Sequence, residues 1–383
     1  MNKLAVIGKG TAGSLTYNHF GYYTDWEIEC YYDTLSKEQT VGEGTTVTLP
    51  RNLHYTAGFE FYKMKEFHGQ YKNGIHYINW TDENYMHTFP PPSISMHFSA
   101  IDLQEYIAEK NKNRVKFKDI KVNNVYDIDA DFIIDCSGTP NKFDDFEFAE
   151  FIPVNTAYVR QCNWDYPIYD YTICIAAEYG WIFGIPLSYR MSWGYMYNQQ
   201  ITDHNVAKEQ LLEVIDNYGM QPTEQENRLD FNNYYRKQNF FESIAYNGNA
   251  SFFLEPMEAT SLTTVDNINR KIYDSIVNKE SIDEHNEWYK KTFKQLQDII
   301  VMHYLGATKY DNEFWNYAKN LAEKCLSDNS LNQREYTEIL DNINNIGYDL
   351  VYDYGVWRMH SFNQNINSLG ILKKLKELNV SKK

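Results

Sequence analysis

The sequence lacks the features that mark several classes of protein. Its five cysteines are odd in number and form no CxxC pair, so neither a disulfide framework nor a zinc site is indicated. No apolar run is long enough to span a membrane. The N-terminus enters an apolar run without the charged and apolar regions of a signal peptide. We therefore expect a protein of the reducing cytoplasm with no membrane attachment.

Basic residues are also scarce. Lysine and arginine number 36 against 52 acidic residues, which gives a net charge of -16. A protein that binds nucleic acid needs a basic excess to neutralise phosphates, so we expect no nucleic-acid partner. The 383 residues suffice for two domains, or for one large core with a satellite, and for a buried active site.

A glycine-rich turn follows the first apolar run. Residues 4–7 (LAVI) predict a buried parallel strand, and a helix is predicted from Ser14 to about Phe20. Between them, residues 8–13 (GKGTAG) give GxGxxG in its required context of strand, turn and helix. Gly8 permits the turn, Gly10 lets the backbone approach a pyrophosphate, and Gly13 lets helix and strand pack closely. The pattern predicts a dinucleotide site.

Two later segments support this prediction. Residues 26–33 predict a second strand, and Asp33 at its end suits a contact with ribose hydroxyls. Residues 130–138 predict an apolar strand that ends in a turn of small residues. Cys136 in this turn could be a nucleophile, but packing of a small buried cysteine is the favoured interpretation. A glycine-rich turn in another kind of α/β protein remains an alternative.

Lys72 stands just ahead of an alternating run that predicts a strand. Together with this segment, 71–80, further segments stand in a fixed order along the chain: 8–13, 41–46, 96–100, 135–138, 180–187, 252–261, 297–304 and 314–315. In this order they resemble the motifs of the flavin-dependent halogenases of the tryptophan halogenase type. The family motifs for the segments up to 261 are GGGTAG, VGEAT, KxGIxFxNW, YHFDA, DCSG, GWxWxIP and FxxPLESTG. Among the differences, Lys9 stands in place of a glycine and Phe183 in place of a tryptophan.

The resemblance implies a reaction and its reagents. Reduced FAD, oxygen and a halide would give hypohalous acid, which Lys72 would direct onto an electron-rich aromatic carbon. Lys72 would hold the acid by a hydrogen bond or form a haloamine, and a lysine shifts its protonation readily on burial. Glu258 would remove the proton from the ring or polarise the oxidant. An exposed charge at Lys72 and a carboxylate at a helix N-terminus at Glu258 are the structural alternatives.

The same resemblance assigns the remaining site residues. Glu43 and Gly44 would lie in a strap over the flavin. The backbone amides of Thr260 and Ser261 would bind the halide; the family has glycine where Ser261 stands, which leaves the halide preference open. A bulky wall would keep the organic substrate away from the flavin, and plain core packing is compatible with that role. The implied cofactor-binding residues are Gly8, Gly10, Thr11, Ala12, Gly13, Asp33, Glu43 and Gly44, and the wall residues are Trp181, Phe183, Ile185 and Pro186.

The partners are inferred from motifs that are missing. No second GxGxxG segment that could bind a nicotinamide dinucleotide is evident, so a separate flavin reductase is expected to supply FADH2. We find no equivalent of the elements that hold the amino-acid end of free tryptophan, so we expect another indole, phenol or heteroarene as substrate. Whether the chain forms a homo-oligomer is left open. His97 and His303 lack partners at metal-ligand spacing, so packing or hydrogen bonding is expected and no metal site is predicted.

The predicted fold class is α/β. We expect an FAD-binding Rossmann-like domain over 1–265, with an inserted antiparallel sheet at about 155–200, and a helical C-terminal subdomain over 266–383. A stripe of Tyr289, Phe293, Leu296, Ile300 and Tyr304 predicts one buried helix face, and helices follow near 313–326, 333–345 and 367–378. An FAD-dependent aromatic monooxygenase and a non-catalytic FAD-binding protein are the alternative functions.

Overall fold

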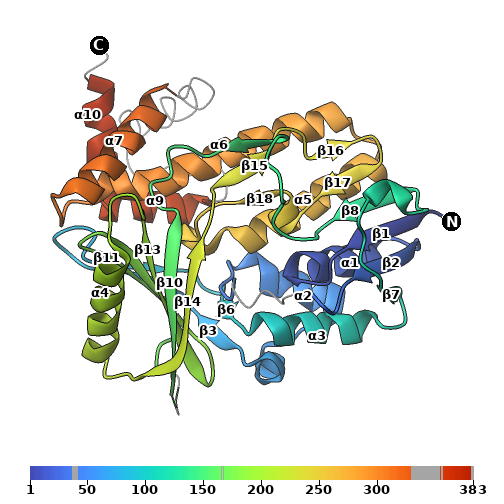
Figure 1. The fold of residues 1–383 in the computed structure, drawn as a ribbon, viewed down its shortest axis with the longest axis horizontal. Helices are drawn as coiled ribbons and strands as arrows, with labels where there is room; N and C mark the ends of the chain where they lie inside the picture. The colour runs from blue at the N-terminus through green and yellow to red at the C-terminus, as the bar shows by residue number, and fades with distance from the viewer. Residues whose placement is uncertain (37–41, 165, 167, 329–353, 355–356, 381–383) are drawn as a thin grey trace. The chain divides into compact units, whose positions relative to one another are not determined.

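The computed structural model describes residues 1–36, 42–164, 166, 168–328, 354 and 357–380 (Figure 1). The chain forms two compact units, each built from three segments. The first comprises 1–70, 95–148 and 234–290, and the second 71–94, 149–233 and 291–383. The domain boundary that the sequence predicts at residue 265 remains a prediction. The compact units differ from it because the antiparallel sheet groups with the C-terminal helices.

A mostly parallel sheet forms the centre of the first unit. Its order is β16-β17-β8-β1-β2-β7, and only the edge strand β16 is antiparallel to its neighbour. Apolar side chains make β1 a buried strand, as its sequence predicts. The strands are β1 (Lys3–Ile7), β2 (Glu27–Tyr32), β7 (Val115–Asp119), β8 (Phe132–Asp135), β16 (Phe240–Phe241) and β17 (Ile244–Tyr246).

Helices and a small sheet complete the first unit. Helix α1 (Thr11–Tyr23) packs against α3 (Ala100–Asn111) and α5 (Ser261–Ile276), and α2 (Thr48–Ala57) contacts all three. Ser99 caps α3 by accepting a hydrogen bond from the Asp102 N–H. The small sheet is antiparallel and consists of β9 (Phe146–Phe148), β15 (Tyr234–Arg236) and β18 (Phe252–Phe253). β3 (Gln70–Lys72) and β6 (Ser95–His97) lie at the segment ends, and 3-10 helices cover Phe61–Phe67, Val125–Asp127, Gly248–Ala250 and Met257–Ala259.

A seven-stranded sheet forms the centre of the second unit. Its order is β14-β10-β13-β12-β11-β4-β5, and all neighbours are antiparallel except the parallel pair β11 and β4. This is the antiparallel sheet expected at about 155–200, extended at both edges. The strands are β4 (Gly74–Ile78), β5 (Tyr85–Thr88), β10 (Thr156–Asn163), β11 (Thr172–Ala177), β12 (Gly180–Pro186), β13 (Arg190–Tyr197) and β14 (Pro222–Asp230).

Helices cover both faces of this sheet. On one face, α4 (His204–Asn217) buries Ala207, Leu211 and Ile215 in an aromatic-rich core (Figure 1). On the other face, the Tyr77 hydroxyl of β4 lies 3.2 Å from Nε2 of His303 on α6 (Ile282–Gly306). The remaining helices are α7 (Glu313–Asp328), α9 (Met359–Ser368) and α10 (Ile371–Val380).

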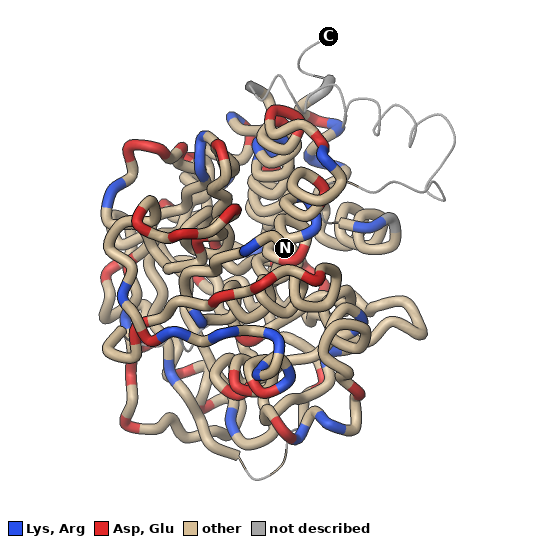
Figure 2. The backbone as a smooth tube through the Cα atoms, turned by 90° about the vertical axis from the view of Figure 1, so that its right-hand side faces the viewer, with Lys and Arg blue, Asp and Glu red and all other residues tan. Residues whose placement is uncertain are grey.

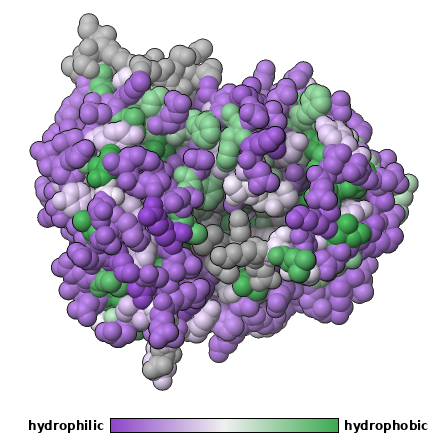
Figure 3. Space-filling view, in the orientation of Figure 1, coloured by the Kyte–Doolittle hydropathy of each residue, from purple (hydrophilic) through white to green (hydrophobic). Residues whose placement is uncertain are grey.

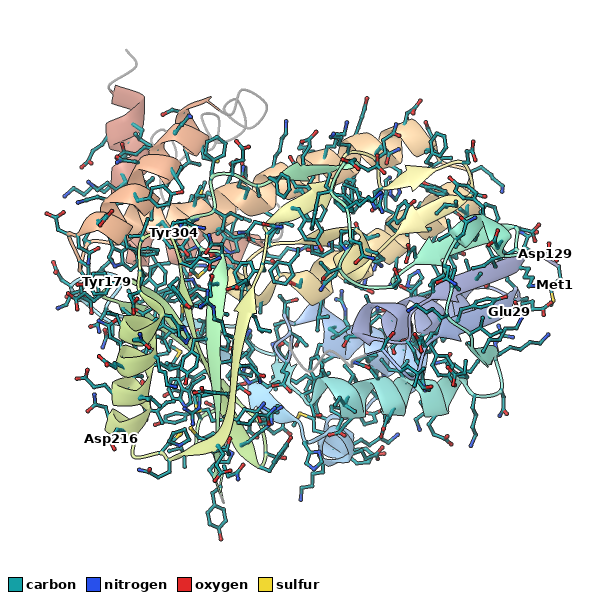
Figure 4. The ribbon with its side chains drawn as sticks, in the orientation of Figure 1. Met1, Glu29, Asp129, Tyr179, Asp216 and Tyr304 are labelled. Carbon is teal, nitrogen blue, oxygen red and sulfur yellow. The ribbon has the colours of Figure 1, made fainter. Side chains whose placement is uncertain are left out.

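The predicted C-terminal helices are partly revised. All five side chains of the predicted α6 stripe are buried, and the stripe includes Tyr304, labelled in Figure 4. Helix α7 matches the segment predicted near 313–326, while the one near 333–345 lies outside the described residues. The segment near 367–378 is not a single helix. Gly370 has φ +71° and ends α9 before α10 begins, which is the usual use of a left-handed glycine.

The charged residues are distributed over the chain. Figure 2 shows acidic and basic positions interspersed along the backbone, and the face in Figure 3 is mainly hydrophilic with small apolar groups between. Glu29, labelled in Figure 4, is a buried carboxylate held by Lys3 at 3.2 Å and Lys118 at 2.7 Å. The Lys118 ammonium and the Tyr31 hydroxyl lower the pKa of Glu29 to about 2 against the effect of burial. None of the helices formed by the described residues is both long and apolar enough to cross a lipid bilayer.

His19 on α1 gives a prediction for stability at low pH. It is 4% exposed, it packs on Tyr23 and Tyr273, and burial followed by repulsion from Arg270 lowers its pKa to about 3. The unfolded chain takes up a proton near pH 6.5 but the folded chain does not, so stability should fall as the pH drops from 6.5 towards 3, by about 5 kcal/mol in all. Denaturant unfolding at pH 7.5 and 5 should show a smaller loss in His19→Phe than in wild type. Equal losses would contradict this assignment; exposed His54→Phe is the control.

Candidate functional site

The glycine-rich turn lies between β1 and α1, as predicted. A Cβ on Gly8 would collide with the Cys136 carbonyl oxygen, and one on Gly13 would collide with the Gly8 oxygen. No heavy atom lies within 4 Å of the position that a Cβ on Gly10 would take, so space remains beside the turn. The two tight contacts pack helix, turn and β8 closely, while the backbone at Gly10 stays accessible to a ligand. This arrangement fits a dinucleotide pyrophosphate.

Asp33, another predicted cofactor residue, follows β2, the strand that pairs with β1. Its carboxylate accepts hydrogen bonds from the Leu35 N–H at 2.9 Å and the Ser36 hydroxyl at 3.1 Å. These two bonds leave further acceptor capacity on the carboxylate for a ribose. Cys136 is buried 3.6 Å from the Thr16 hydroxyl, and burial raises the pKa of its thiol well above the ordinary range. Such a cysteine packs and is a poor nucleophile, as the sequence favours.

The strap and the start of α5 come together in the first unit. Gly44 lies beside Ala259, since a Cβ placed on Gly44 would be 3.7 Å from the Ala259 Cβ. Gly44 also forms an antiparallel bridge with His97. Further along the strap, the Thr46 hydroxyl hydrogen-bonds to that of Thr263 on α5. The predicted strap therefore packs against the segment in which the halide site is predicted.

The backbone before α5 is strained. Glu258 and Ala259 have positive φ angles of 67° and 51°, a conformation that side chains other than glycine rarely adopt. Strain of this kind persists only where the surroundings enforce it, and it concentrates at functional sites. Thr260 then takes right-handed angles, and the first helical hydrogen bond runs from the Thr264 N–H to the Thr260 oxygen at 2.9 Å. The amides of residues 261–263 precede this bond and point along the helix axis.

Lys72 lies in the second unit, at the end of β3, and is 1% exposed. The alternative of an exposed lysine is therefore wrong. Its ammonium nitrogen lies 5.8 Å from the centre of the Phe89 ring. The next residue, Asn73, is fixed by Asp170: its N–H donates to the Asp170 oxygen at 2.6 Å and its amide to the carboxylate at 2.6 Å. Phe89 and Asp170 carry no local sequence signal, and only the fold places them beside the lysine.

The predicted wall residues lie on β12. Side chains alternate along a strand, so Trp181, Phe183 and Ile185 share one face of the sheet and Pro186 lies on the opposite one. The strand register brings the end of β12 towards the start of β4, since Ile173 pairs with Gly184 and Thr172 with Ile75. Lys72 and Ile185 are therefore at the same end of this sheet. Trp181 is farther along the strand, with its ring centre 6.1 Å from that of Phe183.

The Phe183 ring depends on Gly194 of β13. The two residues pair across the strands, and a Cβ on Gly194 would collide with the ring. We expect Gly194→Ala to displace Phe183 and to destabilise the protein by about 1–3 kcal/mol, the usual cost of overpacking. Phe183→Leu should recover part of this loss in the double variant, because the shorter side chain leaves room. Thermal unfolding of the four proteins measures the coupling, and strictly additive losses would contradict the proposed contact.

The two histidines are inside the protein. Nε2 of His303 shares a hydrogen bond with the Tyr77 hydroxyl, and its Nδ1 lies 2.9 Å from the Ile299 oxygen, as expected for a hydrogen-bonded residue. His97 is fully buried in β6. Among the residues that the structure describes, no group of histidine, cysteine and carboxylate side chains could hold a metal ion. Gly138, in the predicted turn after β8, has φ +105°, while Gly248, which abuts Ala12 of the glycine-rich turn, was not predicted.

A parallel sheet with a glycine-rich turn between its first strand and the following helix is the arrangement of dinucleotide-binding proteins, flavoproteins among them. A family model described as "Tryptophan halogenase" matches residues 3–126 and 108–378. The chain belongs to this family, which confirms the predicted resemblance and fold class.

Relatives with known names agree. The chain is 25% identical over 261 residues to tryptophan 6-halogenase SttH of Streptomyces toxytricini, covering 59% of this chain and 49% of that protein. It is 24% identical over 208 residues to tryptophan 7-halogenase RebH of Lentzea aerocolonigenes, covering 50% and 39%. The chain thus spans half or less of the length of these curated relatives. The solved structure of Xcc4156, a flavin-dependent halogenase from Xanthomonas campestris, shares the fold with a TM-score of 0.81 and 17% identity, covering 97% of this chain and 89% of that one.

Proposed function

We propose that the protein is an FADH2-dependent halogenase that transfers a halogen to an electron-rich aromatic carbon. The family match over most of the chain carries this proposal. The open turn at Gly10, the strained backbone at Glu258 and the buried Lys72 support it from the structure. FADH2, oxygen, halide and a proton give FAD, hypohalous acid and water; hypohalous acid and the arene then give the haloarene and water.

The first unit would hold the cofactor and the halide. The turn residues Gly8, Gly10, Thr11, Ala12 and Gly13 would face the pyrophosphate, with the N-terminus of α1 favouring its negative charge. Asp33 would bind the ribose, and Glu43 and Gly44 would cover the flavin. When bound, reduced FAD supplies the two electrons that oxygen needs to oxidise the halide.

The halide would bind the amides of Thr260 and Ser261. Left-handed residues followed by a right-handed one form concave groups of N–H donors that bind anions, and 258–260 have this sequence of angles. A halide held there needs no lysine or arginine partner. Glu258, on the same strained segment, would take the proton that the aromatic ring releases.

Lys72 would hold the hypohalous acid. A buried ammonium is a strong donor because little water competes for it. The Phe89 ring and the Asn73–Asp170 hydrogen bonds keep its segment in place. Trp181, Phe183 and Ile185 would form the wall that keeps the organic substrate from the flavin, and Pro186 would stiffen the end of the strand. In this proposal Lys72 binds the oxidant, and the wall residues restrict the organic substrate.

The remaining reagents come from outside the chain. We infer a separate flavin reductase, an aromatic substrate other than free tryptophan, and a cytoplasmic setting. All five cysteines are described and buried, and none of them forms a disulfide, which suits a reducing compartment.

A single assay tests the proposed function. Purified protein receives FAD, a flavin reductase with its nicotinamide, oxygen, and chloride or bromide, together with a panel of indoles, phenols and free tryptophan. Mass spectrometry should show haloarene, identified by the chlorine or bromine isotope pattern, that depends on halide. An oxygenated product without halide would instead identify a monooxygenase. Bound FAD without any product would identify a binding protein, and turnover of free tryptophan alone would contradict the expected substrate class.

A further inference from the structure

Lys9 is a cation inside the glycine-rich turn. Its backbone oxygen accepts a hydrogen bond from the Ser14 hydroxyl at 3.1 Å, which fixes it to the first turn of α1. Its ammonium nitrogen lies 5.0 Å from the centre of the Tyr32 ring and 5.4 Å from that of Phe117. Tyr32 is the last residue of β2, and Phe117 lies in the middle of the neighbouring strand β7. Lys9 therefore carries a positive charge over the carboxyl ends of the strands, where a dinucleotide lies in this fold.

No acidic side chain of the described residues neutralises Lys9. The ion pairs near this edge involve other lysines, such as Lys118 with Glu29 and Lys121 with Asp33. Aromatic faces attract a cation and hold it in one place, but they leave all of its N–H donors able to form hydrogen bonds. The ammonium of Lys9 is thus held against the Tyr32 and Phe117 rings while its charge stays available to a ligand.

We propose that Lys9 binds the adenosine diphosphate half of FAD and makes this enzyme hold its cofactor more tightly than a glycine at this position would. Because the ligand is FAD, the role rests on the proposed function. The pyrophosphate carries negative charge that the N-terminus of α1 alone neutralises only in part. A lysine ammonium adds a charge-assisted hydrogen bond, which is shorter and stronger than a neutral one. Lys9 then selects FAD over FMN, which lacks the adenosine half.

Binding of oxidised FAD, ADP and FMN, followed by calorimetry or flavin fluorescence, tests this role. Lys9→Gly and Lys9→Met should weaken FAD binding at least about tenfold, the effect of losing one hydrogen bond to a charged group. ADP binding should weaken by a similar factor and FMN binding should stay unchanged. Lys9→Arg should restore most of the FAD affinity. Raising the salt concentration should weaken FAD binding more in wild type than in Lys9→Met.

A matched control is Lys110→Met on α3. Lys110 also lies over a tyrosine ring, 5.1 Å from the centre of Tyr106, but away from the turn, so its loss should leave FAD binding unchanged. Thermal unfolding without FAD separates binding from folding. If the Lys9 variants bind FAD as wild type does and are only less stable without FAD, the role of Lys9 is wrong while the proposed function stands. A wild-type protein that binds no FAD would overturn the proposed function and this role with it.

Discussion

Replacing Lys72 by methionine should abolish halogenation, with a loss of about a thousandfold or more, while FAD binding stays unchanged. Methionine keeps the length and fills the buried site but offers no N–H donor to hypohalous acid and no amine to halogenate. The loss expected for a positioned proton-transfer or donor group is about 10²–10⁴-fold. The cofactor turn lies in the other compact unit, so its affinity for FAD should not change.

The Lys72→Met protein should also fold normally. Lys72 is 1% exposed, and methionine fills its buried site with a side chain of similar length, so no cavity is left to destabilise the fold. Halogenated product, FAD affinity and thermal unfolding are measured side by side. Lys319→Met is the control, because this half-buried lysine on α7 has a pKa lowered by burial but no assigned role. Halogenation by Lys72→Met at the wild-type rate would remove the lysine from the mechanism.

Glu258→Gly should make the protein more stable and much less active. Glycine adopts positive φ without steric penalty, so the strain at φ 67° is relieved, and we expect a gain of up to about 1 kcal/mol. In the proposed mechanism the Glu258 carboxylate accepts the ring proton, so its loss should lower halogenation at least about a hundredfold. A variant that unfolds at a higher temperature but turns over more slowly identifies a residue that is kept in a strained conformation for function.

A second left-handed glutamate separates these two effects. Glu242 has φ 54° in the exposed turn between β16 and β17, away from the strap and α5. Glu242→Gly should give a similar gain in stability and leave turnover unchanged. If Glu258→Gly were as active as Glu242→Gly, the carboxylate would have no part in the reaction, and the strain would need another explanation.

Local sequence patterns predicted the elements that are short, apolar and bounded by glycine. The first strand, the turn and α1 follow from LAVI and GKGTAG because a buried parallel strand and a tight turn leave few other choices of residue. The buried face of α6 was also predictable, because large apolar residues at helical spacing indicate a helix with one buried face. The break at Gly370 was missed because amphipathic spacing continues on both sides of it.

The candidate site was predictable only in part. Motifs gave Lys72, Glu258 and the strap. No pattern could show that Phe89 lies near the lysine or that Asp170 binds the next residue, Asn73, because the fold brings these residues together. The left-handed angles at Glu258 and Ala259 were also hidden, since neither residue type signals positive φ as glycine does. Pro186 was grouped with the wall by its motif, whereas strand alternation places it on the other face.

The interleaving of the two units governs how the gene can be recombined. Segments 1–70, 95–148 and 234–290 alternate along the chain with 71–94, 149–233 and 291–383. A chimaera made with one crossover would combine part of each unit from both parents and would disrupt two hydrophobic cores. Exchanging the unit that carries Lys72, to change which arene is halogenated, would require all three of its segments to be transferred together. Substrate range should therefore evolve by point substitution in this chain more readily than by shuffling.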